Sequence, residues 1–105
     1  MQTEHVLPAW AANFIEQDQE GLTAEHRVAV LARIGELAHE GSWQEINDVI
    51  CNVPVSDLTD GALMTLLRGT FRFKERLSGW DDLREQVEAQ LDGRKANTPR
   101  LLMGL

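Results

Sequence analysis

The sequence predicts an all-α fold: a single-domain bundle of about five short helices around a central apolar helix at about residues 59–77. Apolar residues recur at three- and four-residue steps along most of the chain, as on one face of a helix. No segment alternates apolar and polar residues for long enough to indicate a strand. Tyrosine is absent and β-branched residues are sparse, which also disfavours a sheet.

Length and composition indicate one ordinary globular domain. The chain has 105 residues, of which 43% are hydrophobic and 26% are charged. These values exclude a disordered or low-complexity protein. We expect a helical domain over residues 1–93. A polar linker and an apolar C-terminal segment, residues 94–105, should follow and dock on the same domain.

The first two helices are expected on either side of Gly21. Pro8 suits the first turn of a helix that contains Trp10 and ends at Gly21. Thr23 should cap the second helix, and Gly41 should end it in a left-handed conformation. The core-facing stripe of the second helix is predicted to contain Val28, Leu31, Ile34, Leu37 and Ala38.

The third helix should be short. Ser42 and Glu45 are spaced as a capping box, in which each side chain binds the backbone amide of the other residue. Pro54 disfavours helical geometry at Val53, so the helix should end there. Residues 52–57 are expected to form a non-helical connector.

The fourth helix is the strongest prediction. Thr59 should cap it, with Leu58 and Leu63 as a hydrophobic staple. Its apolar face, continued by Phe71 and Phe73, is too wide for a surface helix and indicates a central position.

The fifth helix should follow closely. We expect the fourth to run as far as Leu77, although Gly69 weakens its middle. Ser78, with Asp81 three residues later, is expected to cap the fifth helix, and Gly93 should close it.

Charge divides the chain into two parts. The net charge is −7, which opposes non-specific binding to nucleic acid or an anionic membrane. Residues 1–57 hold ten acidic and two basic residues, whereas residues 58–105 hold seven acidic and eight basic residues. This asymmetry is explained either by a solvated acidic surface that keeps the protein soluble or by an acidic face that meets a basic partner.

No pattern of catalytic or metal-binding residues stands out. His5, His26 and His39 lie far apart in the sequence and suggest no metal site. Cys51 is the only cysteine, so no internal disulfide can form and a reducing, cytoplasmic location is favoured. A catalytic role for it would need a neighbouring histidine. We therefore expect no enzyme activity, no cofactor and no membrane span. A pocket between helices that is lined with carboxylates of shifted pKa, or with Cys51 beside a histidine, would revive a small enzyme or ligand binder.

The favoured interpretation is a small acidic protein-interaction module: an adaptor, inhibitor or regulator that acts by surface binding to a basic protein partner. Small size, acidic balance and the lack of a catalytic motif make the chain similar to many accessory proteins of bacterial or phage mobile elements. The expected contact residues cluster around the second and third helices: Glu36, Glu40, Trp43, Glu45 and Asp48.

The alternative interpretation is a nucleic-acid-associated regulator, acting as a monomer or a dimer. Four basic residues would form its binding ridge: Arg68, Arg72, Lys74 and Arg76. Phe71 and Phe73 lie between them, but they continue the apolar stripe and are expected in the core. Glu75 also interrupts the basic field, so nucleic acid is the less favoured partner. Either interpretation is compatible with a homodimer.

Overall fold

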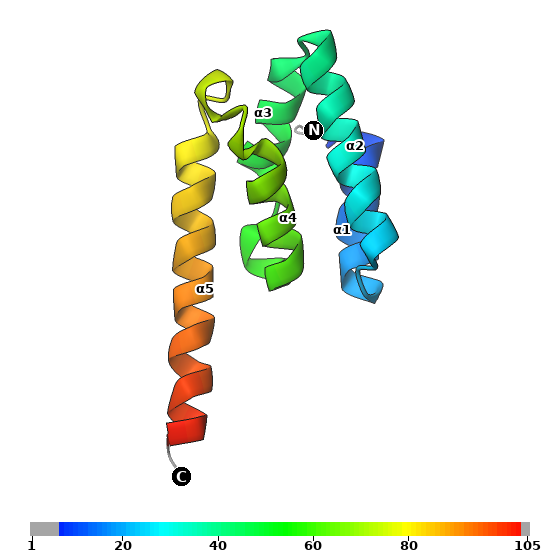
Figure 1. Cartoon of the computed structure of the whole chain (residues 1–105). Coiled ribbons are helices and arrows are strands. Elements are labelled where there is room, and N and C mark those ends of the chain that lie inside the picture. The colour runs from blue at the N-terminus through cyan, green and yellow to red at the C-terminus, as the bar shows by residue number, and fades with distance from the viewer. Residues whose placement is uncertain (1–6, 104–105) are drawn as a thin grey trace, which may run out of the picture.

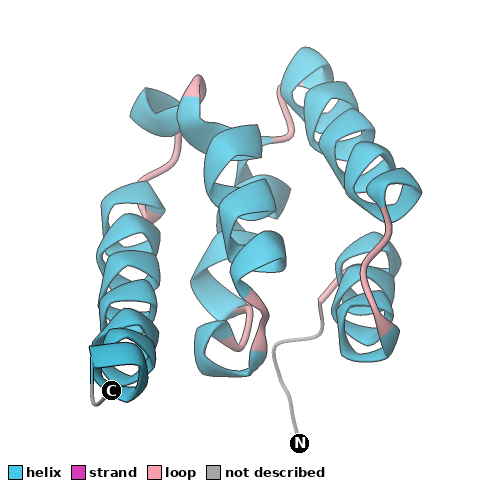
Figure 2. Ribbon diagram, turned by 60° about the horizontal axis from the view of Figure 1, so that its bottom comes forward, coloured by secondary structure: helices cyan, strands magenta, loops and turns pink. Residues whose placement is uncertain are grey.

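The computed structural model describes the backbone of residues 7–103 and the side chains of residues 7–95. It confirms the all-α prediction, since the described residues form helices and connecting turns without a strand (Figure 2). The elements are α1 (Ala9–Glu20), α2 (Ala24–Glu40), α3 (Trp43–Asn52), the 3-10 turn η1 (Val55–Asp57), α4 (Asp60–Phe71), the 3-10 turn η2 (Lys74–Arg76) and α5 (Trp80–Met103). Helix α4 lies between α2 and α5, as expected of a central helix (Figure 1).

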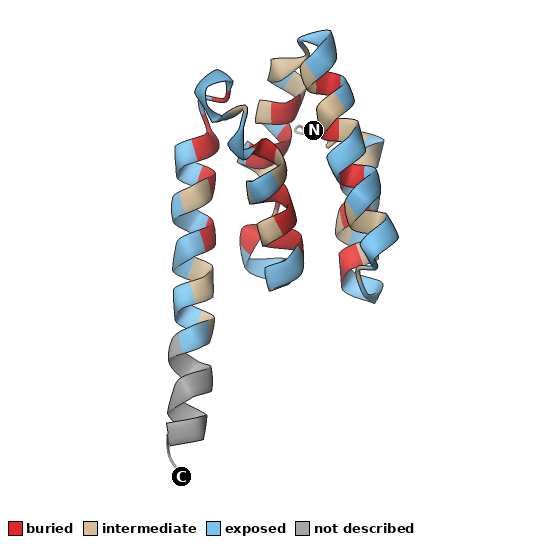
Figure 3. Ribbon diagram, viewed as in Figure 1, coloured by how far each residue is buried: buried red, intermediate tan, exposed pale blue. Residues whose placement is uncertain are grey.

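Apolar side chains from every α-helix meet in one core, on the inward faces of the bundle (Figure 3). The most enclosed large apolar side chains come from all five α-helices and the connector before α4: Phe14, Ile34, Leu37, Ile46, Val49, Leu58, Leu63, Leu66, Leu83 and Val87. Burying each such side chain contributes about 1.5–3 kcal/mol, so this core is the main source of stability.

Helix α2 has the predicted ends but a different buried face. The hydroxyl of Thr23 accepts a hydrogen bond from the His26 amide, and Gly41 ends the helix with a φ of +80°. The buried face contains Val30, together with Ile34 and Leu37 from the predicted stripe. The prediction for two residues was wrong, because Val28 is 63% exposed and Leu31 40% exposed.

The capping box predicted for α3 is absent. The side chain of Ser42 makes no capping hydrogen bond. The Glu45 carboxylate instead accepts a hydrogen bond of 2.9 Å from the indole Nε1 of Trp10. A contact between α1 and α3 has therefore replaced the local one, and Glu45 serves tertiary packing.

Helix α4 begins as predicted but ends at Phe71, six residues before the expected end at Leu77. The Thr59 hydroxyl caps it by accepting a hydrogen bond from the Ala62 amide. Near its end, the Thr70 hydroxyl donates to the carbonyl of Leu66 (2.7 Å) and accepts from the Trp80 indole (3.0 Å). The chain must turn back after α4 for Trp80 to reach Thr70, so one continuous helix over 59–77 is ruled out.

Helix α5 starts later and runs further than predicted. It begins at Trp80, directly after Gly79, whose amide donates to the Asn47 side chain, rather than after Ser78. It passes Gly93 and continues through the expected linker at 94–99 to Met103. A single helical glycine costs only about 1 kcal/mol relative to alanine. The expected docking of residues 101–105 concerns side chains outside the described residues.

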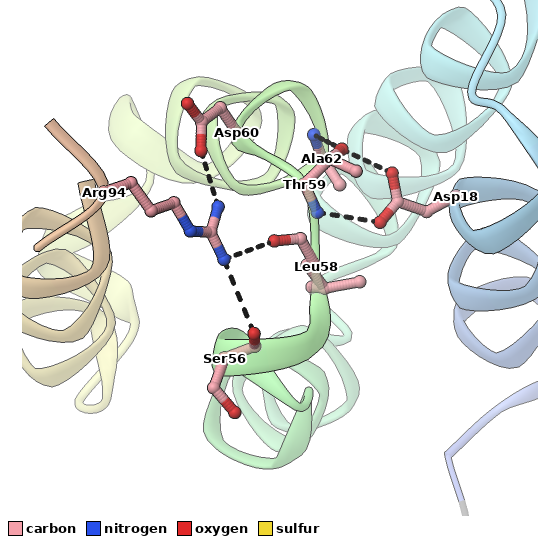
Figure 4. A network of polar contacts seen from close by, with 7 residues as sticks. All are labelled: Asp18, Ser56, Leu58, Thr59, Asp60, Ala62 and Arg94. Carbon is pink, nitrogen blue, oxygen red and sulfur yellow. Dashed lines mark hydrogen bonds and ion pairs between the residues drawn. The ribbon is translucent and has the colours of Figure 1, made fainter. Parts of the chain in front are cut away.

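A polar network at the start of α4 ties three helices together (Figure 4). On one side, the buried carboxylate of Asp18 in α1 accepts hydrogen bonds from the amide and the hydroxyl of Thr59. On the other, the guanidinium of Arg94 in α5 pairs with Asp60 and donates to the Leu58 carbonyl (2.8 Å). The network explains how α5 stays in register with α4 beyond Gly93.

Candidate functional site

Three of the predicted contact residues gather around one arginine. Glu36 pairs with Arg33 at 2.9 Å, and both side chains are exposed at the surface of α2. This hydrogen bond raises the pKa of Arg33, and the charges of Glu40 and Glu45 raise it further. We call Glu36, Glu40 and Glu45 the acidic cluster. The cluster places three carboxylates, two from α2 and one from α3, near the guanidinium of Arg33.

The members of the acidic cluster differ in their availability. Glu40 is exposed, and Glu36 retains 61% of its side-chain surface beside Arg33. Glu45 is half-buried, and its carboxylate is bound to the Trp10 indole. Glu36 and Glu40 are therefore the carboxylates best placed to meet a partner.

Asp48 lies one turn further along α3. It is exposed and accepts a hydrogen bond of 2.7 Å from the Gln44 side chain. Together with Glu45 it lines a shallow depression that also includes Pro8 and Ser42. Because Glu45 belongs to the acidic cluster, the depression places Asp48 next to that cluster.

The sequence predicts Trp43 as a contact residue among acidic neighbours, but the structure does not expose its ring there. It is half-buried, and its ring centroid lies 5.5 Å from that of Phe73. The guanidinium of Arg76 lies over the Trp43 ring, 5.4 Å from the centroid. The structure therefore groups Trp43 with residues of the alternative, basic site.

The four basic residues do not form one ridge along a helix, because α4 ends at Phe71. Arg68 lies in the last turn of α4, Arg72 directly follows it, and Lys74 and Arg76 belong to η2. Arg72 lies over the Phe73 ring, at 4.9 Å from its centroid. The cations are spread over a turn, and three of them, Arg72, Lys74 and Arg76, lie against aromatic rings.

Phe71 is the main correction at this site. It was expected in the core, but 55% of it is exposed. Its ring meets the Trp80 ring edge-on at 5.7 Å, and the Lys74 ammonium lies 5.1 Å from its centroid. The helix ends here and the chain turns, so the apolar periodicity no longer predicts which side faces inward.

The sequence interpretation missed a groove between α2 and α4. Arg27 and Leu31 line it from α2, and Met64 and Arg68 line it from α4. Leu31 had been assigned to the core because it continues the period of α2. Helix α2 has more apolar residues than its buried face holds. This surplus is the signal that could have indicated the exposed groove.

The described residues contain no group of three or more His, Cys, Asp or Glu side chains arranged to hold a metal ion. Cys51 is exposed at the end of α3. Partial burial of the sulfur raises the pKa of the Cys51 thiol, and the nearby charges of Asp48 and Asp82 raise it further. A raised pKa keeps the thiol protonated and weakly nucleophilic. Over the same described range, no helix has the length and apolar content that crossing a membrane requires.

Comparison of the chain with protein-family models, with curated proteins and with solved structures finds no significant match.

Proposed function

We propose that this chain is a small helical protein-interaction module of the cytoplasm, an adaptor, inhibitor or regulator whose acidic cluster binds a basic protein partner. The supporting observations are that Glu36 pairs with Arg33 at 2.9 Å, that Glu36 and Glu40 are exposed, and that the charges of Glu40 and Glu45 also act on Arg33. The excess of carboxylates gives this surface a negative field beyond the charge that Arg33 neutralises. Such a field steers encounter with a basic surface and raises the association rate more than the affinity.

A charge-reversal experiment tests this proposal. The tagged full chain is compared with Glu36→Lys/Glu40→Lys in pull-downs from nuclease-treated lysate of the source organism, read by mass spectrometry. The matched control is Glu20→Lys/Glu85→Lys, which makes the same charge change at exposed positions on α1 and α5. Circular dichroism verifies that each variant is folded.

The expected result is a basic protein that the wild type and the control capture and the Glu36/Glu40 variant does not. With that protein purified, the association rate should fall as salt rises. Equal capture by both double variants would refute the acidic cluster as the contact surface.

Nucleic-acid binding is kept as a second candidate because Phe71 is exposed beside Lys74. Exposed aromatic rings next to cations can stack on bases while the cations contact phosphates. Arg72→Glu should then abolish the shift of a labelled single-stranded oligonucleotide at low salt, whereas Arg84→Glu on α5 should not. No shift of the wild type at micromolar protein would dismiss this candidate.

A further inference from the structure

The groove between α2 and α4 has a basic rim along its length and an apolar floor in the half that contains Met64. One half, of about 290 Å³, is lined by Arg27, Leu31, Gly61, Met64, Thr65 and Arg68. The other half, of about 280 Å³, is lined by Leu31, Gly35, Arg68, Gly69, Arg72 and Phe73. Leu31 and Arg68 line both halves, so the two hollows lie next to each other along the helix pair.

The floor of the groove exists because the two helices approach closely. At Gly69, a β-carbon would stand 2.6 Å from the Cδ2 atom of Leu31. Leu31 fills the space over the glycine and remains 40% exposed within the groove. Val28, one turn earlier on α2, is 63% exposed but is not among the residues that line the groove. Leu31 and Val28 are two of the three large hydrophobic residues that the described part of the chain exposes. A partner could therefore bury an apolar surface here.

The rim of the groove is positive although the protein is acidic. Arg27, Arg68 and Arg72 line it, and none of the described lining residues is Asp or Glu. Neither Arg27 nor Arg68 forms an ion pair within residues 7–95. Two arginines beside an apolar floor are thus available to bind carboxylates, which an arginine fork can hold in bidentate geometry.

We propose that this groove is a second binding surface and that it takes an acidic amphipathic helix of a partner protein. Each half lies at or below the roughly 300 Å³ where small-molecule pockets begin, so side chains of a protein fit it better than a whole ligand. The lining residues on α4 run from Gly61 to Gly69, about 12 Å at the helical rise, which matches two turns of a docked helix, and Arg72 and Phe73 extend the groove past the end of α4. Leucines of that helix would cover Leu31 and Met64, and its carboxylates would meet the arginines.

Nucleic acid fits the groove less well than an acidic helix. Phosphates would also pair with the arginines, but bases stack on free aromatic rings. Phe73, the aromatic residue among the described lining residues, is half-buried, packs against Trp43 and lies under the Arg72 guanidinium. The exposed ring of Phe71 is not among the residues that line either half. The groove is a different surface from the acidic cluster, so a negative binding result for one surface would not contradict the proposal for the other.

The test uses the full chain and three synthetic helical peptides of 18 residues. The first carries leucine at positions i, i+3, i+4 and i+7 with flanking glutamates. In the second, lysines replace the glutamates, and in the third, serines replace the leucines. Binding is measured by fluorescence anisotropy, and the site is mapped by amide chemical-shift changes.

The acidic leucine peptide should bind and shift amides of α2 and α4, whereas the other two should bind at least tenfold more weakly. Arg27→Glu/Arg68→Glu should weaken binding by roughly tenfold or more, as expected for replacing two attractions with repulsion. The matched control Arg84→Glu/Lys95→Glu, which makes the same charge change on α5, should bind like the wild type.

Several results would overturn the proposal. One is equal binding of the acidic and basic peptides, and another is equal binding by the two double variants. Tighter binding of a single-stranded oligonucleotide in the same groove would assign the groove to nucleic acid. Concentration-dependent shifts of α2 and α4 without peptide would assign it to a second copy of the chain.

Discussion

Asp18 in α1 accepts two hydrogen bonds from Thr59, the residue that caps α4: one from the amide at 2.9 Å and one from the hydroxyl at 2.5 Å. The carboxylate is only 4% exposed. The same Thr59 hydroxyl accepts from the Ala62 amide, so one threonine both starts α4 and binds α1. This pair anchors the first helix to the central one.

Asp18→Ala should destabilise the fold by about 2–3 kcal/mol, because two hydrogen bonds to a charged group are lost and the cap loses its orientation. Urea unfolding followed by circular dichroism measures the change. Glu16→Ala, at an exposed position of α1, is the control and should have little effect. A loss below 0.5 kcal/mol, on the scale of surface substitutions, would contradict the structural role of Asp18.

Arg94→Ala should loosen the attachment of α5. The side chain is 33% exposed, pairs with Asp60 and donates to the Leu58 carbonyl, so its loss should cost about 1–2 kcal/mol. Amide hydrogen exchange should rise most in α5 around residue 94. Lys95→Ala, at the exposed neighbouring position, should leave the exchange unchanged. Equal exchange in both variants would show that Arg94 does not hold the helix.

Gly79 packs against Cys51, and the two positions should be energetically coupled. A β-carbon at Gly79 would collide with the Cys51 sulfur and would lie 3.3 Å from the Asn47 side-chain oxygen. Gly79→Ala should therefore destabilise by about 1–3 kcal/mol. Cys51→Ala removes the sulfur and should restore part of that loss.

A double-mutant cycle measures this coupling by urea unfolding of the wild type, both single variants and the double variant. We expect a coupling of at least about 0.5 kcal/mol, the lower end of the range for contacting residues. Strict additivity of the two substitutions would mean that the sulfur yields freely and that Gly79 is needed for another reason.

Cys51 should react slowly with iodoacetamide near neutral pH, because burial and the charges of Asp48 and Asp82 raise the thiol pKa. The pH midpoint of the alkylation rate should lie above that of a free cysteine. Asp82→Asn should lower the midpoint by removing one of the two charges, whereas Asp92→Asn, further along α5, should not. Identical midpoints in the wild type and Asp82→Asn would rule out that charge as a cause.

The raised pKa of Cys51 also sets a direction for stability at alkaline pH. Below the pKa of the unfolded chain the thiol is protonated in both states and contributes nothing to the pH dependence. Above it, the unfolded chain loses the proton more readily, so the folded state is progressively disfavoured as pH rises. Cys51→Ala should reduce this alkaline loss of stability in urea unfolding at successive pH values.

Sequence reasoning succeeded where an element depends on residues close together in the chain. Thr23 caps α2 three residues from His26, and Gly41 ends the same helix, so both ends could be read locally. Glu36, Glu40 and Glu45 lie within ten residues of one another, and the structure brings their charges close enough to act on Arg33; their role as a contact surface stays a prediction. Sequence reasoning misplaced Trp43, because the Phe73 ring that covers it lies thirty residues away.

By itself the sequence determined the helical class, most helix starts and the residues of the main core, because helical period and capping act over three or four residues. Only the tertiary structure decided where α4 stops, how far α5 runs and which apolar residues stay exposed. Those outcomes depend on distant partners: the Trp80 indole on Thr70, Arg94 on Asp60, and Leu31 over Gly69. The local preference for helix is weak, and the free energy of each such contact exceeds or offsets it. The local sequence pattern alone therefore could not predict these three outcomes.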